Sequence, residues 1–299
     1  MSDRPTTVRP LALVTGAAGL IGHALVADAT RWAPDWEVWG VTRDDIDLTQ
    51  IDQVRAFWHN RRPQLVIPCA GLTRPAQCER DPALAHRLNI EITNHLAELA
   101  REIPFVFFST DLVFDGKKGH YVETDPVNPL NVYAETKASA ERVVLANPEH
   151  TVIRTSLTTG RSPTGDRSFV EETRQAWEAG RTLTLFTDEV RCPIPVSATT
   201  RAVWELVQKG LTGLYHLAGA EAFSRWEIGQ LLARRWPELA AKMASGSLCD
   251  YVGPARPPDL SLNCEKIQSV LSFPLPSFRD WLADGVSTGA PWSPIHLPC

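Results

Sequence analysis

Short apolar runs alternate with helix-forming stretches over the first half of the chain. The apolar runs cover 11–15, 37–42, 64–71, 104–110 and 150–156. The stretches between them show helical spacing, most clearly 83–102 and 133–144. Strands that alternate with helices of this length favour a parallel sheet covered on both faces. The pattern therefore predicts an α/β protein with a doubly wound parallel sheet.

The second half is less regular and predicts a smaller lobe. Its predicted helices cover 169–180, 198–210 and 226–236, and Ser224 with Glu227 forms a capping box that opens the last of them. We expect residues 1–158, with roughly 191–219, to form the nucleotide-binding domain. Residues 159–190 and 220–299 are expected to form an interleaved C-terminal substrate-binding lobe.

A glycine-rich turn joins the first predicted strand to the first helix. Gly16, Gly19 and Gly22 are spaced for a tight turn, a close approach to a diphosphate, and close packing of helix on strand. Leu20 and Ile21 open the helix, whose N-terminus attracts phosphate. This arrangement predicts the dinucleotide-binding, or Rossmann, type of sheet.

Ligands in such sheets bind at the carboxyl ends of the strands, which selects further candidates for the cofactor site. Arg43 follows the second strand where NAD-preferring proteins usually carry an acid, so NADP(H) is the preferred cofactor. Asp44 and Asp45 follow closely and keep NAD(H) open. The other candidates are Asp47 and Leu48, expected beside the adenine, and Ala70 and Gly71 after the third strand. Thr49 is expected to cap the next helix.

Tyr133 and Lys137 are four residues apart on a predicted helix, so both lie on one face. An ammonium beside a phenol lowers the phenol pKa toward the working range of an acid–base group. The hydroxyls of Ser109 and Thr110, at the end of the fourth strand, can complete a site that holds a carbonyl oxygen. On an arbitrary helix, a tyrosine and a lysine at this spacing usually have no catalytic role. The glycine turn and the alternating strands favour a catalytic role here.

The composition argues against nucleic-acid, membrane and metal partners. The net charge of −5 and pI near 5.9 provide no basic surface for nucleic acid. No apolar run approaches the roughly 20 residues that span a bilayer. The six cysteines have no metal-ligand or disulfide spacing, so reduced thiols, no metal site and a cytoplasmic location are expected.

These features together resemble a known family. The segments TGAAGLIG, STDLVFDG, PLNVYAETK, VIRTS, GLYHLAG and ARPPDLSLN resemble the extended short-chain dehydrogenase/reductases, and more narrowly the dTDP-4-dehydrorhamnose reductase family. The resemblance implies transfer of hydride from NAD(P)H to the 4-keto group of a nucleotide-linked deoxysugar. It implies that Tyr133 is the catalytic acid, that Lys137 lowers its pKa and binds the nicotinamide ribose, and that Thr110 orients the keto group.

Further site residues follow from the same resemblance. Asp111 and Asn89 match positions that face the substrate, although a buried asparagine that bonds within the helices is an alternative for Asn89. Arg191 and Arg256 are candidate clamps for a diphosphate or carboxylate. For Arg191 the alternative is a structural pair with Asp188 or Glu189. The segment that contains Arg191, DEVRCPIP, stands where the family carries Asp-Gln-x-Gly-x-Pro.

Departures from the family leave the sugar and the nucleotide open. Leu112 and Leu157 stand where relatives carry aromatic residues that border the substrate. Dehydratases of the superfamily need a glutamate where Leu112 stands, which disfavours dehydration. The alternatives are a nucleotide-sugar epimerase, which would retain NAD, and a non-catalytic NADP(H)-binding regulatory subunit like that of methionine adenosyltransferase. A homodimer is compatible with the family.

Overall fold

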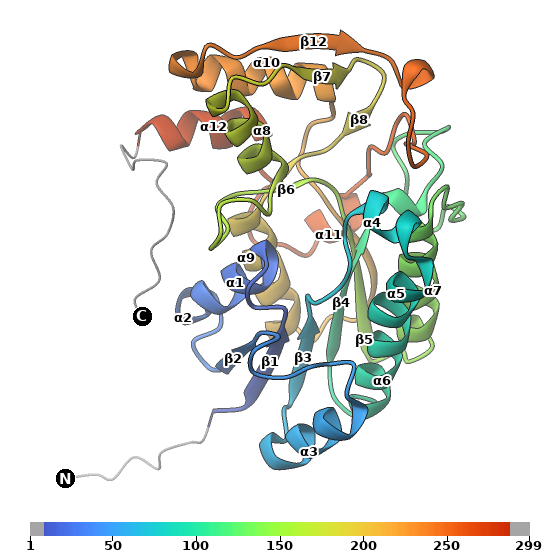
Figure 1. Cartoon of the computed structure of the whole chain (residues 1–299). Helices are drawn as coiled ribbons and strands as arrows, with labels where there is room; N and C mark the ends of the chain where they lie inside the picture. The colour runs from blue at the N-terminus through green and yellow to red at the C-terminus, as the bar shows by residue number, and fades with distance from the viewer. Residues whose placement is uncertain (1–8, 288–299) are drawn as a thin grey trace, which may run out of the picture.

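A six-stranded parallel sheet forms the centre of the computed structural model, which describes residues 9–287 (Figure 1). The strand order is β10-β5-β4-β3-β1-β2, so the chain runs from β1 to β2 at one edge and then from β3 on the other side of β1 to β10 at the opposite edge. The predicted doubly wound sheet is therefore confirmed. The strands are β1 (Leu11–Thr15), β2 (Glu37–Val41), β3 (Leu65–Pro68), β4 (Phe105–Thr110), β5 (His150–Thr155) and β10 (Gly213–Leu217).

Alternating side chains of the strands bury both faces of the sheet. In β1, Ala12 and Val14 belong to one apolar cluster, and Leu13 belongs to the other. Trp204 fills the first cluster, where its indole Nε1 donates to the carbonyl oxygen of Leu25 at 3.2 Å. The first face is covered by α1 (Leu20–Ala27), α2 (Ala29–Trp32), α9 (Val196–Gln208) and α11 (Glu265–Gln268), and the second by α3 (Ile51–Arg61), α6 (Ile92–Leu99) and α7 (Val132–Leu145).

A smaller lobe lies over one end of the sheet (Figure 1). Its own core contains Val170, Trp177, Ile228 and Phe278. Its helices are α8 (Phe169–Glu178), α10 (Arg225–Arg235), α12 (Phe278–Ser287), η3 (Pro237–Leu239) and η4 (Leu248–Asp250). Its strands form three pairs: β7 (Leu183–Phe186) with β12 (Met243–Gly246), β8 (Val190–Arg191) with β11 (Phe223–Ser224), and β6 (Thr158–Thr159) with β9 (Ile194–Pro195).

Local sequence signals account for most helix boundaries. The capping box predicted at Ser224 and Glu227 is confirmed: Ser224 Oγ accepts from the Glu227 amide at 3.2 Å, and a Glu227 carboxylate oxygen accepts from the Ser224 amide at 2.7 Å. The cap predicted at Thr49 is wrong, because α3 begins at Ile51 and the Thr49 hydroxyl donates to Asp47 instead.

The long helix predicted over 83–102 is divided. Helices α4 (Pro75–Arg80) and α5 (Pro82–His86) lead into a π-helical turn, η1 (Arg87–Glu91), before α6 continues. None of the described helices is both long and apolar enough to cross a membrane. Residues 1–8 and 288–299 of the two predicted domains lie outside the described residues.

Candidate active site

The glycine turn after β1 lies directly against the end of β3. Gly16 has a φ of +67°, and a Cβ atom there would stand 2.6 Å from the amide nitrogen of Ala70. A Cβ atom at Gly22 would run into the carbonyl oxygen of Gly16. Glycine is therefore required at both positions, and the turn brings together two of the strand ends predicted to meet.

Helix α1 begins at this turn without a capping side chain. Its N-cap is Gly19, whose amide donates to the Gly16 carbonyl at 2.9 Å, and Leu20, Ile21 and Gly22 form the first helical turn. First-turn amides and the helix dipole attract an anion. The close-packed glycines and these amides fit the diphosphate of a dinucleotide.

The end of β2 presents Arg43 and Asp44 as exposed residues. Asp45 is engaged locally, because it accepts from both the amide and the hydroxyl of Thr42 at 2.8 Å, and these hydrogen bonds lower its pKa. Asp47 likewise accepts from the amide and hydroxyl of Thr49, which lowers its pKa. Leu48 packs against the apolar cluster under α3 and α6.

Tyr133 lies in the first turn of α7, which follows a long loop after β4. Asn131 caps this helix by accepting from the Ala134 amide at 2.9 Å, and Tyr133 is 8% exposed. Burial raises the pKa of the Tyr133 phenol, the charge of Asp111 raises it further, and a hydrogen bond with Thr110 acts in the opposite direction. The lowering predicted from Lys137 is therefore wrong in its net direction. The phenol is held protonated at neutral pH, as a proton donor must be.

Lys137 lies one helical turn further, above the sheet. Its Nζ is 3.9 Å from the centroid of the Phe107 ring on β4. Burial lowers the pKa of Lys137 to about 8, although the charge of Glu141 acts to raise it. Cys69, which follows β3 and lies against Gly16, also interacts with Lys137. Lys137 therefore faces the predicted cofactor side of the site.

Asn89, in the π-helical turn, connects the loop after β3 to α7. Its amide nitrogen donates to Thr136 Oγ1 at 2.9 Å and to the Leu72 carbonyl at 3.0 Å, and its Oδ1 accepts from the Leu72 amide at 2.8 Å. The Thr136 hydroxyl in turn donates to the carbonyl of Tyr133 at 2.7 Å. Asn89 is 3% exposed. Its placement agrees with the alternative from the sequence, a buried asparagine engaged in structural hydrogen bonds. Gly71 passes so close that a Cβ there would be 2.9 Å from Asn89 Oδ1.

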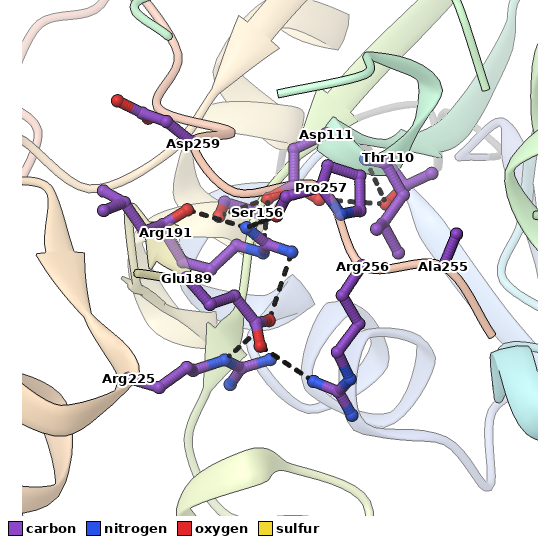
Figure 2. A network of polar contacts seen from close by, with 12 residues as sticks. Thr110, Asp111, Ser156, Glu189, Arg191, Arg225, Ala255, Arg256, Pro257 and Asp259 are labelled. Carbon is purple, nitrogen blue, oxygen red and sulfur yellow. Dashed lines mark hydrogen bonds and ion pairs between the residues drawn. The ribbon is translucent and has the colours of Figure 1, made fainter. Parts of the chain in front are cut away.

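Thr110 and Asp111 stand where β4 ends, at the start of η2 (Asp111–Val113). The Thr110 hydroxyl donates to Asp111 Oδ1 at 3.2 Å, and Ser156 Oγ donates to Asp111 Oδ2 at 2.7 Å (Figure 2). Burial raises the pKa of Asp111, and Arg191, whose Nε is 3.9 Å from Oδ2, acts to lower it. The neighbouring hydroxyl of Ser109 is buried and has no hydrogen-bond partner in the structure, so Thr110 is the strand-end hydroxyl next to Tyr133.

Glu189 is surrounded by arginines (Figure 2). Its carboxylate lies 3.1 Å from Arg191, 3.1 Å from Arg225 and 2.9 Å from Arg256. Burial acts to raise the Glu189 pKa, but the arginines outweigh it and lower that pKa to about 2. Arg191 is also bonded to the carbonyls of Val190 at 2.7 Å and Pro257 at 3.2 Å. Arg191 therefore sits in the structural pair with Glu189, whereas the Arg256 side chain is 37% exposed and can meet a ligand.

Sequence reasoning did not select Arg225, Ser156 or the central role of Glu189. Arg225 is the first residue of α10, and a cation there opposes the helix dipole. That unfavourable placement was the signal of a nearby anion. Among residues 9–287, no group of three or more His, Cys, Asp or Glu side chains is placed to hold a metal ion.

Comparisons with known proteins agree on one family. The model of the RmlD substrate binding domain matches residues 11–289. A probable low-salt glycan biosynthesis reductase of Haloferax volcanii is 30% identical, covering 91% of this chain and 96% of its own. A dTDP-4-dehydrorhamnose reductase of Sinorhizobium fredii is 29% identical, with 89% and 93% covered. Methionine adenosyltransferase 2 subunit beta of Danio rerio is 26% identical, with 92% and 89% covered.

Solved structures show the same fold. The dTDP-4-dehydrorhamnose reductase of Bacillus anthracis, solved in complex with NADP, superposes with a TM-score of 0.85 and covers 94% of this chain and 100% of its own. At 22% identity that likeness shows the fold alone. The match of the family model over nearly the whole chain decides the assignment: the chain belongs to the RmlD substrate binding domain family of extended short-chain dehydrogenase/reductases.

Proposed function

We propose that this protein is an NAD(P)H-dependent reductase that transfers hydride to the 4-keto group of a nucleotide-linked deoxysugar. The observation that supports the proposal most is the contact of Thr110 with the buried Tyr133 phenol, with Lys137 one turn further along α7, over the Phe107 ring of β4. The names of the curated reductase relatives support the same reaction class.

Each of these side chains has one task in the proposal. A bound nicotinamide cofactor supplies the hydride. The Tyr133 hydroxyl donates its proton to the keto oxygen, which becomes the new hydroxyl group, and the raised phenol pKa keeps that proton available. Thr110 orients the keto group through its contact with the phenol, because its own proton goes to Asp111. Lys137 holds the nicotinamide ribose and stabilises the phenolate left after proton transfer.

NADP(H) is the preferred cofactor in this proposal. Gly16, Gly19, Leu20, Ile21 and Gly22 would hold the diphosphate. Arg43 is exposed at the end of β2, and Asp45 is engaged by Thr42 rather than directed at a ribose. An arginine there pairs with a 2′-phosphate. Asp44 keeps NAD(H) as the second choice, and Asp47, Leu48, Ala70 and Gly71 would line the rest of the cofactor site.

The substrate is proposed to lie between the sheet end and the smaller lobe. Arg256, partly exposed beside the rings of Phe186 and Tyr251, would bind the anionic nucleotide, and Asp111 would stand near the sugar. Asn89 and Arg191 are engaged in buried contacts, so they would act by positioning their neighbours. We propose a cofactor domain of 1–158 and roughly 191–219 and a substrate lobe of 159–190 and 220–299, although α11 within the last range packs on the central sheet.

The test is oxidation of NADPH, followed at its absorbance, with a panel of dTDP- and UDP-linked 4-keto-6-deoxy sugars. We expect turnover with at least one sugar, and Tyr133→Phe should lower kcat by about 10²- to 10⁴-fold, the range of general acid catalysis. Binding of NADPH should survive that substitution. Absence of turnover with every sugar would overturn the proposal, and a Tyr133→Phe variant as fast as the wild type would overturn the role of the phenol.

A second candidate is a non-catalytic NADP(H)-binding subunit. The similarity to methionine adenosyltransferase 2 subunit beta favours it. This candidate predicts tight NADPH binding by fluorescence, no sugar reduction, and a larger enzyme that co-purifies with the chain. The reductase proposal predicts turnover by the isolated chain, so one preparation separates the two.

A further inference from the structure

One buried carboxylate holds three arginines that come from separate parts of the chain. Glu189 precedes β8, Arg191 lies in β8, Arg225 begins α10, and Arg256 lies in the loop before Pro257. The side chains of Glu189 and Arg191 are 1% and 4% exposed. Charges this deeply buried persist in proteins only when they are paired.

Arg191 stands between two carboxylates and thereby connects this cluster to Asp111 at the end of β4. On one side its Nη2 is 3.1 Å from Glu189, and on the other its Nε is 3.9 Å from Asp111. Its Nη1 donates to the carbonyl oxygens of Val190 and Pro257, which fix the position of the guanidinium. The Asp111 carboxylate receives the hydroxyls of Thr110 and Ser156, and Ser156 also accepts from the Cys192 amide at 3.2 Å.

This geometry bears directly on Thr110. A hydroxyl has one proton, and here Asp111 receives it, while the Thr110 oxygen accepts from the Leu112 amide at 3.2 Å. An ionised Asp111 can only accept hydrogen bonds, whereas a protonated Asp111 can donate one to Thr110 and rotate its hydroxyl. The charge on Asp111 therefore decides which way the Thr110 proton points.

We propose that Glu189 and Arg191 are a positioning pair: Glu189 holds Arg191 in place, Arg191 keeps Asp111 ionised and fixed, and this sets the direction of the Thr110 hydroxyl and the charge beside Tyr133. The catalytic part of this inference rests on the proposed reductase function. Both residues stand in the segment DEVRCPIP, where the resemblance implies Asp-Gln-x-Gly-x-Pro.

The charged and titratable groups that face Asp111 make the pair testable. They are Arg191 and Arg225 on the lobe side, Tyr133 on α7, and Cys192 after β8. Removing Arg191 takes away the nearest cation, so Asp111 should be protonated at higher pH. Removing the charge of Glu189 releases Arg191 to pair more closely with Asp111, so Asp111 should be protonated at lower pH.

Carboxyl-carbon NMR of the full chain labelled with ¹³C-aspartate measures the pH at which Asp111 is half protonated. The Asp111→Asn variant assigns the Asp111 signal. We expect the Asp111 midpoint to rise by at least one pH unit in Arg191→Met and to fall in Glu189→Gln. The double variant should lie between them. Glu171→Gln is the matched control, because it neutralises another buried carboxylate, one that bonds Ser162 and Ser168 in the lobe. Asp111 midpoints that are the same in all folded variants would overturn the proposal.

Kinetics then test the link to catalysis. In Arg191→Met we expect kcat to fall about 10- to 100-fold, the effect of a small misplacement of a catalytic group. The acidic limb of its kcat profile should move to higher pH while KM changes little. Glu171→Gln should keep the wild-type profile. If wild type does not turn over, the reductase function fails and NMR still decides the pair; if wild type is active and Arg191→Met keeps its profile, the pair has no catalytic role.

If Glu189→Gln does not fold, as judged by circular dichroism, Arg191→Met alone decides the outcome. Glu189 keeps Arg225 and Arg256 in that variant, so its buried charge remains paired.

Discussion

Replacing Lys137 with methionine should stabilise the protein without its ligands while it removes a proposed catalytic group. Burial lowers the Lys137 pKa from its ordinary 10.5 to about 8, which corresponds to roughly 3 kcal/mol against the folded ammonium form at 1.36 kcal/mol per pKa unit. Methionine has nearly the same length and no charge to desolvate. It loses the contact between the ammonium and the Phe107 ring, worth about 0.5–1 kcal/mol. We therefore expect a net gain of about 2 kcal/mol at pH 7.

The stability advantage of Lys137→Met should depend on pH. Between about pH 8 and 10.5 the unfolded chain keeps the Lys137 proton that the folded chain has released, so wild-type stability rises with pH through this window. Lys137→Met has no such proton, and its advantage should shrink as pH rises.

Urea unfolding followed by tryptophan fluorescence at pH 7 and pH 9.5 measures the advantage of Lys137→Met at both ends. Substitution of the exposed Lys242 by methionine is the control, and its difference from wild type should not depend on pH in this way. The reasoning is refuted if Lys137→Met is no more stable than wild type at pH 7, or if its advantage is the same at both pH values.

Two further predictions concern the cofactor end and the core. Arg43→Ala should weaken NADPH binding by about 10- to 100-fold, the loss of a charged hydrogen bond, and leave NADH binding unchanged in fluorescence titrations; equal losses for both would contradict a contact with the 2′-phosphate. Trp204→Ala should lower the free energy of unfolding by about 3–5 kcal/mol, because Trp204 is fully buried between α9 and α1. Trp204→Phe, measured by the same urea unfolding, should cost clearly less, and a cost as large would mean that the hydrogen bond to Leu25 dominates.

The sheet could be predicted because its signals are local. Each strand is a short apolar run closed by polar or glycine-rich sequence, and its alternation, as in Ala12, Leu13 and Val14, fills two faces at once. The capping box at Ser224 needs only residues three apart. The cap at Thr49 shows the limit of such signals, because Asp47 competed for the same hydroxyl and the helix began later.

The π-helical turn had no comparable signal. The sequence over 83–102 has an ordinary helical pattern, and the extra residue appears where Asn89 turns inward to reach Leu72 and Thr136. Those partners are 17 and 47 residues away. A contact of that range depends on how the loop after β3 and helix α7 pack, which the pattern within one helix does not contain.

The Glu189 cluster extends this reasoning to the chemistry of the site. Considered separately, Glu189 and Arg191 are two buried charges that would each be costly to desolvate. In the fold, Glu189 is compensated by Arg191, Arg225 and Arg256 together, and this arrangement still leaves Arg191 within 3.9 Å of Asp111. Burial also raises the pKa of Asp111 and of Tyr133, so the fixed cation at Arg191 is what favours the ionised carboxylate next to a protonated phenol. The proposed positioning pair therefore acts on the charge beside Tyr133 through one fixed guanidinium.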